Sequence, residues 1–399
     1  MKKRLLITRR NEQIFSSLFE EQKLIQVNVE DAEKQTMLGN IYVGKVKNIV
    51  KNIEAAFVEI SQGQMCYLPL NKSRHPIFCG KRGKNGIVIG DEILVQIEKD
   101  AVKTKNLTVT TELQLAGKYV ILTHGKNFIG ISNKIMEEEE RKRLRTIVSP
   151  FVEKECGMIV RTNAAYVPSE QIEQEVRVLY AQYTAICQTG IYKQAFSLVY
   201  QAPAGYLADI RNSSQEELEK IITDDTTIYQ EIKTFLSTYQ QEDLPKLELY
   251  EDTMISLNQL YGLETKLEKA LQKRVWLKSG GYLVIEPTEA LTVIDVNTGK
   301  AIEGKGQREK HFLKMNVEAG REIAYQLRLR NLSGIILVDF IDMEKAESRR
   351  ELLCQLEQYL KQDPVKTVLV DMTKLNLVEI TRKKTRKPLH EQISFKSGK

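Results

Sequence analysis

Two apolar runs in the last third of the chain each carry an aspartate near their end. Asp295 comes late in LTVIDV, and Asp339 comes late in GIILVDF. Such runs are typical of strands buried inside a layered sheet. Segments with helical periodicity are expected after each run, near 314–330 and 345–361. This alternation predicts a sheet with helices packed on it over residues 280–370, in an α+β or α/β arrangement.

Ligands of layered sheets commonly sit just beyond strand ends, where side chains converge. If the two strands are neighbours, Asp295 and Asp339 share one divalent cation, and Asn297 either contacts a phosphate or holds a carboxylate in place. Carboxylate oxygens suit Mg²⁺ or Mn²⁺, and such an ion polarises a phosphoryl oxygen and activates water. Taken alone, each aspartate is better explained as a turn residue that bonds its own backbone. Asp342 and Glu344 are better explained as helix N-terminal residues than as outer carboxylates.

Residues 38–105 contain short strands broken by Gly and Asn, with no helical period, which predicts a small β-barrel. Five-stranded barrels bind single-stranded nucleic acid by stacking bases on aromatic side chains. Phe57 and Tyr67 lie among lysines in this region, and Lys99 and Lys105 are placed to contact the phosphate backbone. A core position explains Phe57 equally well.

The segment GMIVRTNAA places Arg161 and Thr162 directly after a short apolar strand. Arginine offers a bidentate fork for phosphate, and threonine offers a hydroxyl donor. A terminal phosphate monoester suits that pair. An ordinary surface arginine is the simpler explanation of Arg161 from this segment alone.

Three further helices are predicted. The first covers EQIFSSLFEEQK (12–23), between two strands. A capping box formed by Ser214 and Glu217 opens the second. The third covers residues 258–275, where leucines recur on one helical face.

Composition limits the class of protein. A chain of 399 residues exceeds what one core usually serves, so two to four domains are expected. The five cysteines form no CxxC pair and the four histidines are scattered, which favours neither a disulfide framework nor a zinc site. No apolar run approaches the roughly 20 residues of a membrane span, and no signal peptide is evident, so a cytoplasmic location is expected.

The net charge of +6 is distributed unevenly. Basic clusters at 2–4, 81–84 and 382–387 favour a nucleic-acid partner, although each cluster alone is explained by a solvated face. Neither GxxxxGK[ST] nor GxGxxG occurs, which argues against a phosphotransferase.

Taken together, these motifs resemble the catalytic region of the bacterial ribonuclease E/G family, in its ribonuclease G-like form, over nearly the whole chain. The most specific matches are TEALTVIDVNTGK and RLRNLSGIILVDFIDM. Supporting matches are GNIYVGKVKNIVKNIEAAFVEI, GMIVRT and LVEITRKKTRKPL.

The resemblance implies three sets of site residues. The magnesium-binding aspartates and the asparagine that orients the site match Asp295, Asp339 and Asn297. The RNA-contacting positions of the S1 domain match Phe57, Tyr67 and Lys105. The pocket that senses a 5′-monophosphate matches Gly117, Ile121, Arg161 and Thr162, with isoleucine where the family has valine.

The resemblance also implies an α+β multidomain architecture. An RNase H-like subdomain would use residues 1–35 and 207–270, with the inserted S1 domain (OB-fold) at 36–111 and the 5′-sensor region at 112–206. A DNase I-like α/β domain would cover 271–399.

The implied function is a magnesium-dependent endoribonuclease that cuts single-stranded RNA in rRNA and mRNA processing and decay, leaving a 5′-phosphate and a 3′-hydroxyl. The alternative is a non-catalytic S1-domain RNA-binding or ribosome-associated protein. Family members commonly continue into a cysteine-containing zinc link between protomers, which has no counterpart here. We therefore expect no zinc, and a homodimer would lack its usual zinc-linked interface.

Overall fold

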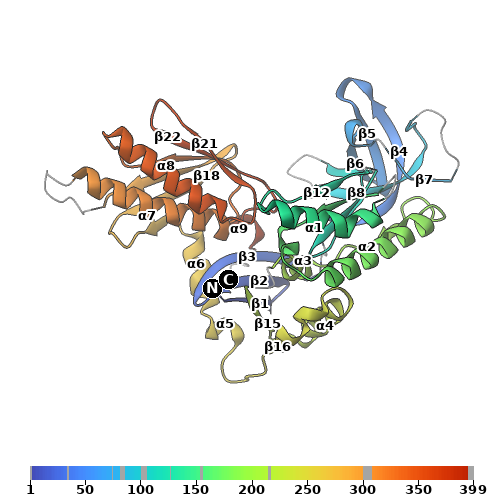
Figure 1. The fold of residues 1–399 in the computed structure, drawn as a ribbon, viewed down its shortest axis with the longest axis horizontal. Helices are drawn as coiled ribbons and strands as arrows, with labels where there is room; N and C mark the ends of the chain where they lie inside the picture. The colour runs from blue at the N-terminus through green and yellow to red at the C-terminus, as the bar shows by residue number, and fades with distance from the viewer. Residues whose placement is uncertain are drawn as a thin grey trace. The chain divides into compact units, whose positions relative to one another are not determined.

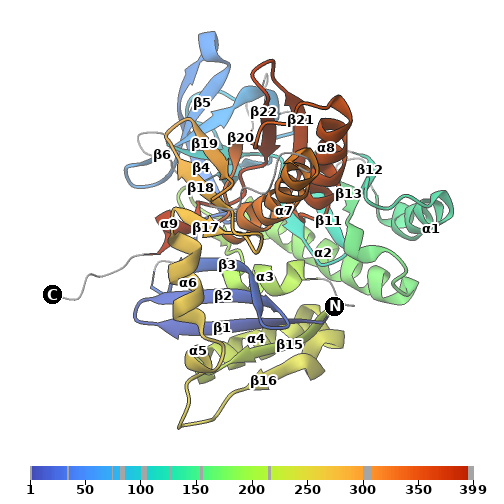
Figure 2. The ribbon, with the colours of Figure 1, turned by 90° about the vertical axis from the view of Figure 1, so that its left-hand side faces the viewer.

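The computed structural model describes residues 2–33, 36–73, 75–80, 86–99, 106–125, 127–152, 156–213, 217–299 and 308–393. The chain is mixed α+β, as predicted, and forms two units (Figures 1 and 2). Unit 1 comprises Met1–Glu33, Glu217–Tyr229 and Leu247–Lys399, and unit 2 comprises Lys34–Glu216 and Gln230–Lys246. None of the helices in the described residues has the length and hydropathy of a membrane span.

Unit 1 contains a five-stranded sheet in the order β16-β15-β1-β2-β3. Its strands are β1 (Lys3–Arg10), β2 (Gln13–Glu20), β3 (Lys23–Asp31), β15 (Leu218–Thr223) and β16 (Leu247–Leu249). The first three strands form an antiparallel meander, whereas β15 runs parallel to β1 and β16 runs parallel to β15. The sheet therefore joins two distant parts of the chain.

The helix predicted over residues 12–23 is wrong, because most of that segment forms β2. Asn11 and Glu21 adopt left-handed conformations, with φ of 52° and 53°, and turn the chain at both ends of the strand. The strand then pairs with β1 on one side and β3 on the other. These long-range pairings override the helical propensity of the glutamates and glutamines.

The other two predicted helices are also corrected. Ser214 lies outside the described residues, and the segment that follows Glu217 is strand β15, since it pairs with β1. Residues 257–271 form two helices, α5 (Leu257–Leu260) and α6 (Leu263–Leu271), separated by Gly262. Gly262 has φ of 57°, a left-handed conformation that interrupts a continuous helix.

A six-stranded sheet forms the rest of unit 1, in the order β17-β18-β19-β20-β22-β21. The strands are β17 (Arg274–Trp276), β18 (Tyr282–Pro287), β19 (Leu291–Asn297), β20 (Gly334–Asp339), β21 (Thr367–Met372) and β22 (Leu377–Arg382). Helices α7 (Arg308–Leu329) and α8 (Ala346–Lys361) lie side by side on the sheet, which confirms both helices predicted there (Figure 1). A short helix, α9 (Leu389–Gln392), follows the sheet.

The two faces of this six-stranded sheet differ. One face packs against α7 and α8, with Ile294, Val338 and Ile380 in the shared core. On the opposite face Val293 and Ile335 remain exposed. Because side chains alternate along a strand, every second residue of β19 and β20 projects from this open face.

Unit 2 begins with the predicted β-barrel. Its strands are β4 (Ile41–Val50), β5 (Ala55–Ser61), β6 (Gln64–Pro69), β8 (Glu92–Lys99) and β9 (Leu107–Thr110). They pair in the order β4-β5-β6-β9-β8, and pairing of β4 with β8 closes the ring. This closed five-stranded arrangement is OB-like. The short strands β7 (Phe78–Cys79) and β14 (Leu198–Tyr200) add to β8 and β4.

A second, four-stranded sheet in unit 2 has the order β10-β11-β13-β12. Its strands are β10 (Gln114–Ala116), β11 (Val120–His124), β12 (Ile129–Ile131) and β13 (Cys156–Val160). The helices of this region are α1 (Glu138–Val148), α2 (Ser169–Gly190) and α3 (Gly205–Asn212). Helix α2 is, with 22 residues, the longest of the three. Helix α4 (Thr226–Tyr239) begins in unit 1 and ends in unit 2.

Candidate active site

Asp295 and Asp339 lie on the open face of the six-stranded sheet. Strands β19 and β20 are parallel, and Asp295 is the register partner of Asp339. Adjacent strands are about 4.8 Å apart, so the two carboxylates stand next to each other. Ile294 and Val338, which precede them, are fully buried on the opposite face. The structure therefore brings together the two aspartates that the sequence singled out.

The electrostatics of the pair reflect their closeness. Burial raises the pKa of Asp339, and the neighbouring carboxylates of Asp295 and Asp342 raise it further. Asp342, which the sequence favours as a helix N-terminal residue, thus lies near enough to act on this site. A group of like charges is relieved by a bound cation.

Asn297 donates a hydrogen bond from Nδ2 to Oδ2 of Asp295, at 2.7 Å. Two roles were predicted for Asn297, contact with a phosphate or support of a carboxylate. This hydrogen bond places it for the second role. An outer hydrogen bond of this kind fixes the orientation of the carboxylate.

The donor set suits a hard cation that keeps water in its coordination shell. In the part of the chain that the structure describes, no three His, Cys, Asp or Glu side chains cluster as a metal cage. Mg²⁺ is usually held by one or two carboxylates, with waters and substrate phosphates completing its shell. Two adjacent aspartates on an open face fit that pattern.

An aromatic group beside the aspartates was not foreseen from the sequence. Trp276 and Tyr282 are register partners on β17 and β18, and their ring centroids lie 5.2 Å apart. The guanidinium carbon of Arg274 lies 4.5 Å from the centroid of the Tyr282 ring. The only signal in the sequence was the single tryptophan of the chain, at an alternate position from Arg274.

On the barrel, Phe57 and Tyr67 are register partners on β5 and β6, with ring centroids 6.2 Å apart in an edge-to-face arrangement. Their neighbours Val58 and Cys66 fill the barrel interior, so the two rings lie on the outer surface and are half-buried. This position contradicts a core role for Phe57. Lys105 lies outside the described residues, as does the basic cluster at 81–84.

The predicted phosphate-sensing residues meet at one end of the four-stranded sheet. Arg161 donates from Nη1 to the carbonyl oxygen of Gly117 at 2.6 Å and from Nη2 to Oδ1 of Asn212 at 2.7 Å. Ile121 lies on β11 beside β13, the strand that leads into Arg161. The Thr162 hydroxyl lies 2.8 Å from that of Ser132, in a hydrogen bond.

Burial and, to a smaller extent, nearby Arg211 lower the pKa of Arg161 to about 10, so the guanidinium stays charged at neutral pH. Both hydrogen-bond acceptors described above are neutral. The negative charge of Glu175 opposes these effects and raises the pKa of Arg161. Arg161 therefore holds a positive charge beside Gly117 and Asn212.

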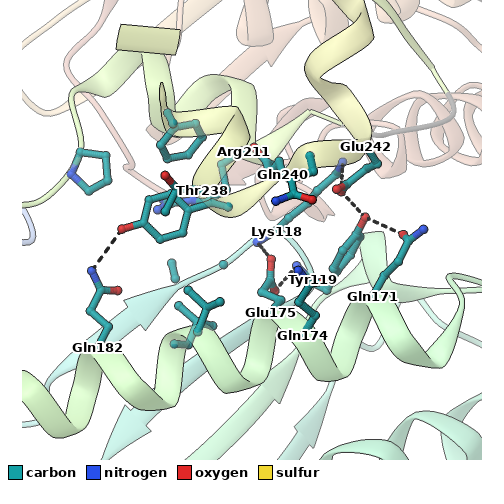
Figure 3. A pocket seen from close by; sticks show the side chains of 18 of the residues that line it. Lys118, Tyr119, Gln171, Gln174, Glu175, Gln182, Arg211, Thr238, Gln240 and Glu242 are labelled. Atoms are coloured by element: carbon teal, nitrogen blue, oxygen red, sulfur yellow. Dashed lines mark hydrogen bonds and ion pairs between the residues drawn. The ribbon is translucent and has the colours of Figure 1, made fainter. Parts of the chain in front are cut away.

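Glu175 on α2 is a buried carboxylate that the sequence did not reveal (Figure 3). Its oxygens accept hydrogen bonds from the backbone N–H groups of Lys118, Tyr119 and Val120, at 2.6–2.8 Å. Burial raises the pKa of Glu175, and these donors oppose that effect. A Cβ at Gly117 would collide with this carboxylate, which explains glycine at that position.

The same pocket contains a fully buried ammonium group (Figure 3). Lys118 pairs with Glu242 at 3.1 Å and also with Asp243. The hydroxyl of Tyr119 donates to Glu242 at 2.7 Å. These contacts join the four-stranded sheet to the 3₁₀ segment Gln241–Lys246 inside unit 2.

One member of the basic cluster at 382–387 is structural. Arg382 is buried, and it donates to Asp363 at 2.7 Å and to Oδ1 of Asn331 at 2.9 Å. Lys383 and Lys384 of the same cluster are exposed. The cluster therefore combines a buried anchor with a basic surface.

Comparison with known proteins points to one family. A family model described as "Ribonuclease E/G family" matches residues 114–385. The chain is 34% identical over 387 residues to "Ribonuclease G" of Haemophilus influenzae, covering 94% of this chain and 78% of that protein. It is 34% identical over 380 residues to "Ribonuclease G" of Escherichia coli K12, covering 93% and 77%. It is also 32% identical over 402 residues to "Ribonuclease E" of a Nostoc species, covering 98% and 57%.

Proposed function

The chain belongs to the ribonuclease E/G family and is an endoribonuclease of RNA processing, and we propose that it hydrolyses single-stranded RNA with a divalent cation held by Asp295 and Asp339. The register pairing of these two aspartates on the open sheet face carries the proposal. Mg²⁺ is the ion that this donor set fits, with Mn²⁺ as the alternative.

The residues of the site have distinct roles in this reaction. A bound divalent ion supplies charge stabilisation at a phosphoryl oxygen and lowers the pKa of a coordinated water. Asp295 and Asp339 hold that ion beside the scissile phosphate, and Asn297 keeps Asp295 in position through its hydrogen bond. The proposed hydrolysis breaks the bond to the 3′ oxygen and leaves a 5′-phosphate and a 3′-hydroxyl.

Substrate binding uses unit 2 in this proposal. The outward-facing rings of Phe57 and Tyr67 stack bases of a single strand, and Lys105 contacts its backbone. A 5′-monophosphate binds beside Arg161 and Thr162, where the charged guanidinium and a hydroxyl lie on consecutive residues. Gly117 and Ile121 complete this pocket through backbone and packing contacts.

The four-part division is retained as part of the proposal, with an RNase H-like subdomain (1–35 and 207–270), an S1 domain (36–111), a 5′ sensor (112–206) and a DNase I-like domain (271–399). The barrel strands between residues 41 and 110 support the S1 assignment, and the sheet that joins β1–β3 to β15 and β16 supports a split first subdomain. A role in rRNA and mRNA decay, a cytoplasmic location and the homodimer stay predictions.

A cleavage assay on a short single-stranded RNA tests the function. The RNA carries either a 5′-monophosphate or a 5′-hydroxyl, and each form is incubated with and without Mg²⁺. We expect cleavage that depends on Mg²⁺ and is faster for the monophosphate. RNA binding without cleavage at any Mg²⁺ or Mn²⁺ concentration would instead support a non-catalytic RNA-binding protein.

A further inference from the structure

The edge of the six-stranded sheet formed by β17 and β18 carries three side chains that pack on one another. Trp276 is the single tryptophan of the chain, and its side chain is large and apolar, yet it is 65% exposed. Its ring lies against Tyr282, and the guanidinium carbon of Arg274 lies 5.8 Å from the Trp276 ring centroid and 4.5 Å from that of Tyr282. We call these three residues the aromatic edge.

Register places the aromatic edge on the same face as the aspartates. One row across the strands runs from Trp276 through Tyr282 to Asn297. Residues that face each other across neighbouring strands project from the same side of a sheet. Leu283 and Ile285, which flank the open-face residues of β18, are buried in the core on the other side. The rings therefore share the open face with the proposed catalytic residues.

A second row of paired residues gives the distance from the aromatic edge to the aspartates. It runs from Arg274 through Val284 to Asp295 and then to Asp339. With strands about 4.8 Å apart, Arg274 is about 10 Å from Asp295, a span that an extended RNA strand bridges within a few nucleotides.

We propose that Trp276 and Tyr282 form a stacking subsite for a nucleobase close to the scissile phosphate, with Arg274 positioned to neutralise the adjoining backbone. This inference rests on the proposed function, because it places the same RNA strand over Asp295 and Asp339. Aromatic side chains on an open sheet surface bind single-stranded bases by stacking, as in sheets that stack two or three bases. Such stacking tolerates any base, because every base has a π-face.

The surroundings favour a nucleotide over an apolar protein surface. A single exposed aromatic residue needs no explanation by itself. Here, however, the neighbours along the two rows are mostly polar or charged: Arg274, Asn297, Asp295 and Asp339, with Val284 as the apolar exception. A nucleotide suits this combination of groups. Its base would stack on the rings, and its phosphates would lie opposite the arginine and a metal ion.

The unique tryptophan provides a direct test. The probe is a ten-nucleotide oligoadenylate with a fluorophore at one end, added to the unmutated protein in EDTA so that no cleavage occurs. We expect the tryptophan fluorescence to be quenched along the same binding curve that fluorescence anisotropy of the label gives. Binding seen by anisotropy with no change in tryptophan emission would overturn the subsite. This readout does not depend on cleavage, so it is separate from the test of the proposed function.

Kinetics on variants provide the second test. Trp276→Ala should lower kcat/KM on single-stranded RNA by about five- to 150-fold, the range that loss of one base–aromatic stack gives, whereas Trp276→Phe should retain most of the activity. Met254→Ala is the matched control, because Met254 is 90% exposed and lies outside the six-stranded sheet. Equal activity of Trp276→Ala and Met254→Ala would refute the subsite even where the unmutated enzyme cleaves normally.

A scan of substrates, each with one abasic nucleotide, locates the stacked base. At one position near the cleavage site, removal of the base should slow cleavage by the unmutated enzyme as much as Trp276→Ala slows cleavage of the intact RNA. The Trp276→Ala variant should cleave that abasic RNA no more slowly than it cleaves the intact RNA, since the two changes remove the same contact. Independent losses at every position would contradict the proposal.

Discussion

Asp295 and Asp339 are register partners across the single parallel strand pair found among the described strands of the six-stranded sheet. The other strand pairings in this sheet are antiparallel. Because only parallel neighbours bring their carboxyl ends to the same edge, two aspartates late in separate strands meet here. The parallel pair therefore places the two carboxylates within reach of one ion.

Asp295→Asn and Asp339→Asn should each abolish cleavage while RNA binding survives. A metal ion contributes several kcal/mol to stabilising a phosphoryl transition state, so its loss lowers the rate by about 10³-fold or more. Single-turnover cleavage measures the rate, and anisotropy of labelled RNA measures binding.

The control is Asp371→Asn, which makes the same substitution at an exposed position of β21, the edge strand on the other side of the sheet. It should leave the rate near that of the unmutated protein. Undiminished cleavage by both Asp295→Asn and Asp339→Asn would refute the proposed metal site.

Asn297→Ala should raise the Mg²⁺ concentration needed for half-maximal cleavage. The hydrogen bond from Asn297 holds one oxygen of Asp295, and loss of such an outer contact typically costs 10- to 100-fold in metal affinity or activity. Titrating the cleavage rate with Mg²⁺ measures the shift. If saturating Mg²⁺ fails to restore any activity, Asn297 acts on the substrate phosphate rather than on Asp295.

Asp295 and Asp339 could be singled out from the sequence because each comes late in an apolar run long enough to identify a buried strand. Their adjacency could not be predicted, since strand order depends on contacts between distant segments. The same limit explains the failure over residues 12–23, where pairing with β1 and β3 decides the structure. Local propensity describes a segment alone and contains no information on its partners.

The aromatic edge escaped prediction for a different reason. Strand β17 has only three residues, too few for an alternating pattern to be visible. Its assignment depends on pairing with β18, which the sequence does not reveal. Glu175 was equally hidden, because α2 presents it to backbone donors that lie more than fifty residues away.

Phe57→Ala and Tyr67→Ala should each weaken binding of single-stranded RNA by about five- to 150-fold, since base–aromatic stacking is worth about 1–3 kcal/mol per base. The two rings contact each other on the outer barrel surface, so the double variant should lose less than the sum of the single losses. Anisotropy of labelled RNA measures affinity. Tyr192→Ala, which changes an aromatic residue that is 85% exposed outside the barrel, is the control and should bind normally.

Arg161→Ala should erase the preference for a 5′-monophosphate, because the charged guanidinium is the proposed phosphate contact. The measurement is the ratio of cleavage rates for 5′-monophosphate and 5′-hydroxyl RNA, which should fall to about one through loss of the faster rate. Arg145→Ala on α1 removes an exposed arginine and should keep the ratio. If the unmutated protein has no preference, the sensor assignment fails.

Asp363→Asn should destabilise unit 1 while its basic surface stays intact. The substitution leaves Arg382 buried without its charged partner, and breaking a buried ion pair in this way costs about 3–5 kcal/mol. For a unit of this size that loss corresponds to a fall in Tm of roughly 6–20 °C, measured by thermal unfolding. Lys384→Ala, at an exposed position of the neighbouring basic cluster, should leave Tm unchanged. A Tm for Asp363→Asn equal to that of Lys384→Ala would show that the Asp363–Arg382 pair does not stabilise the fold.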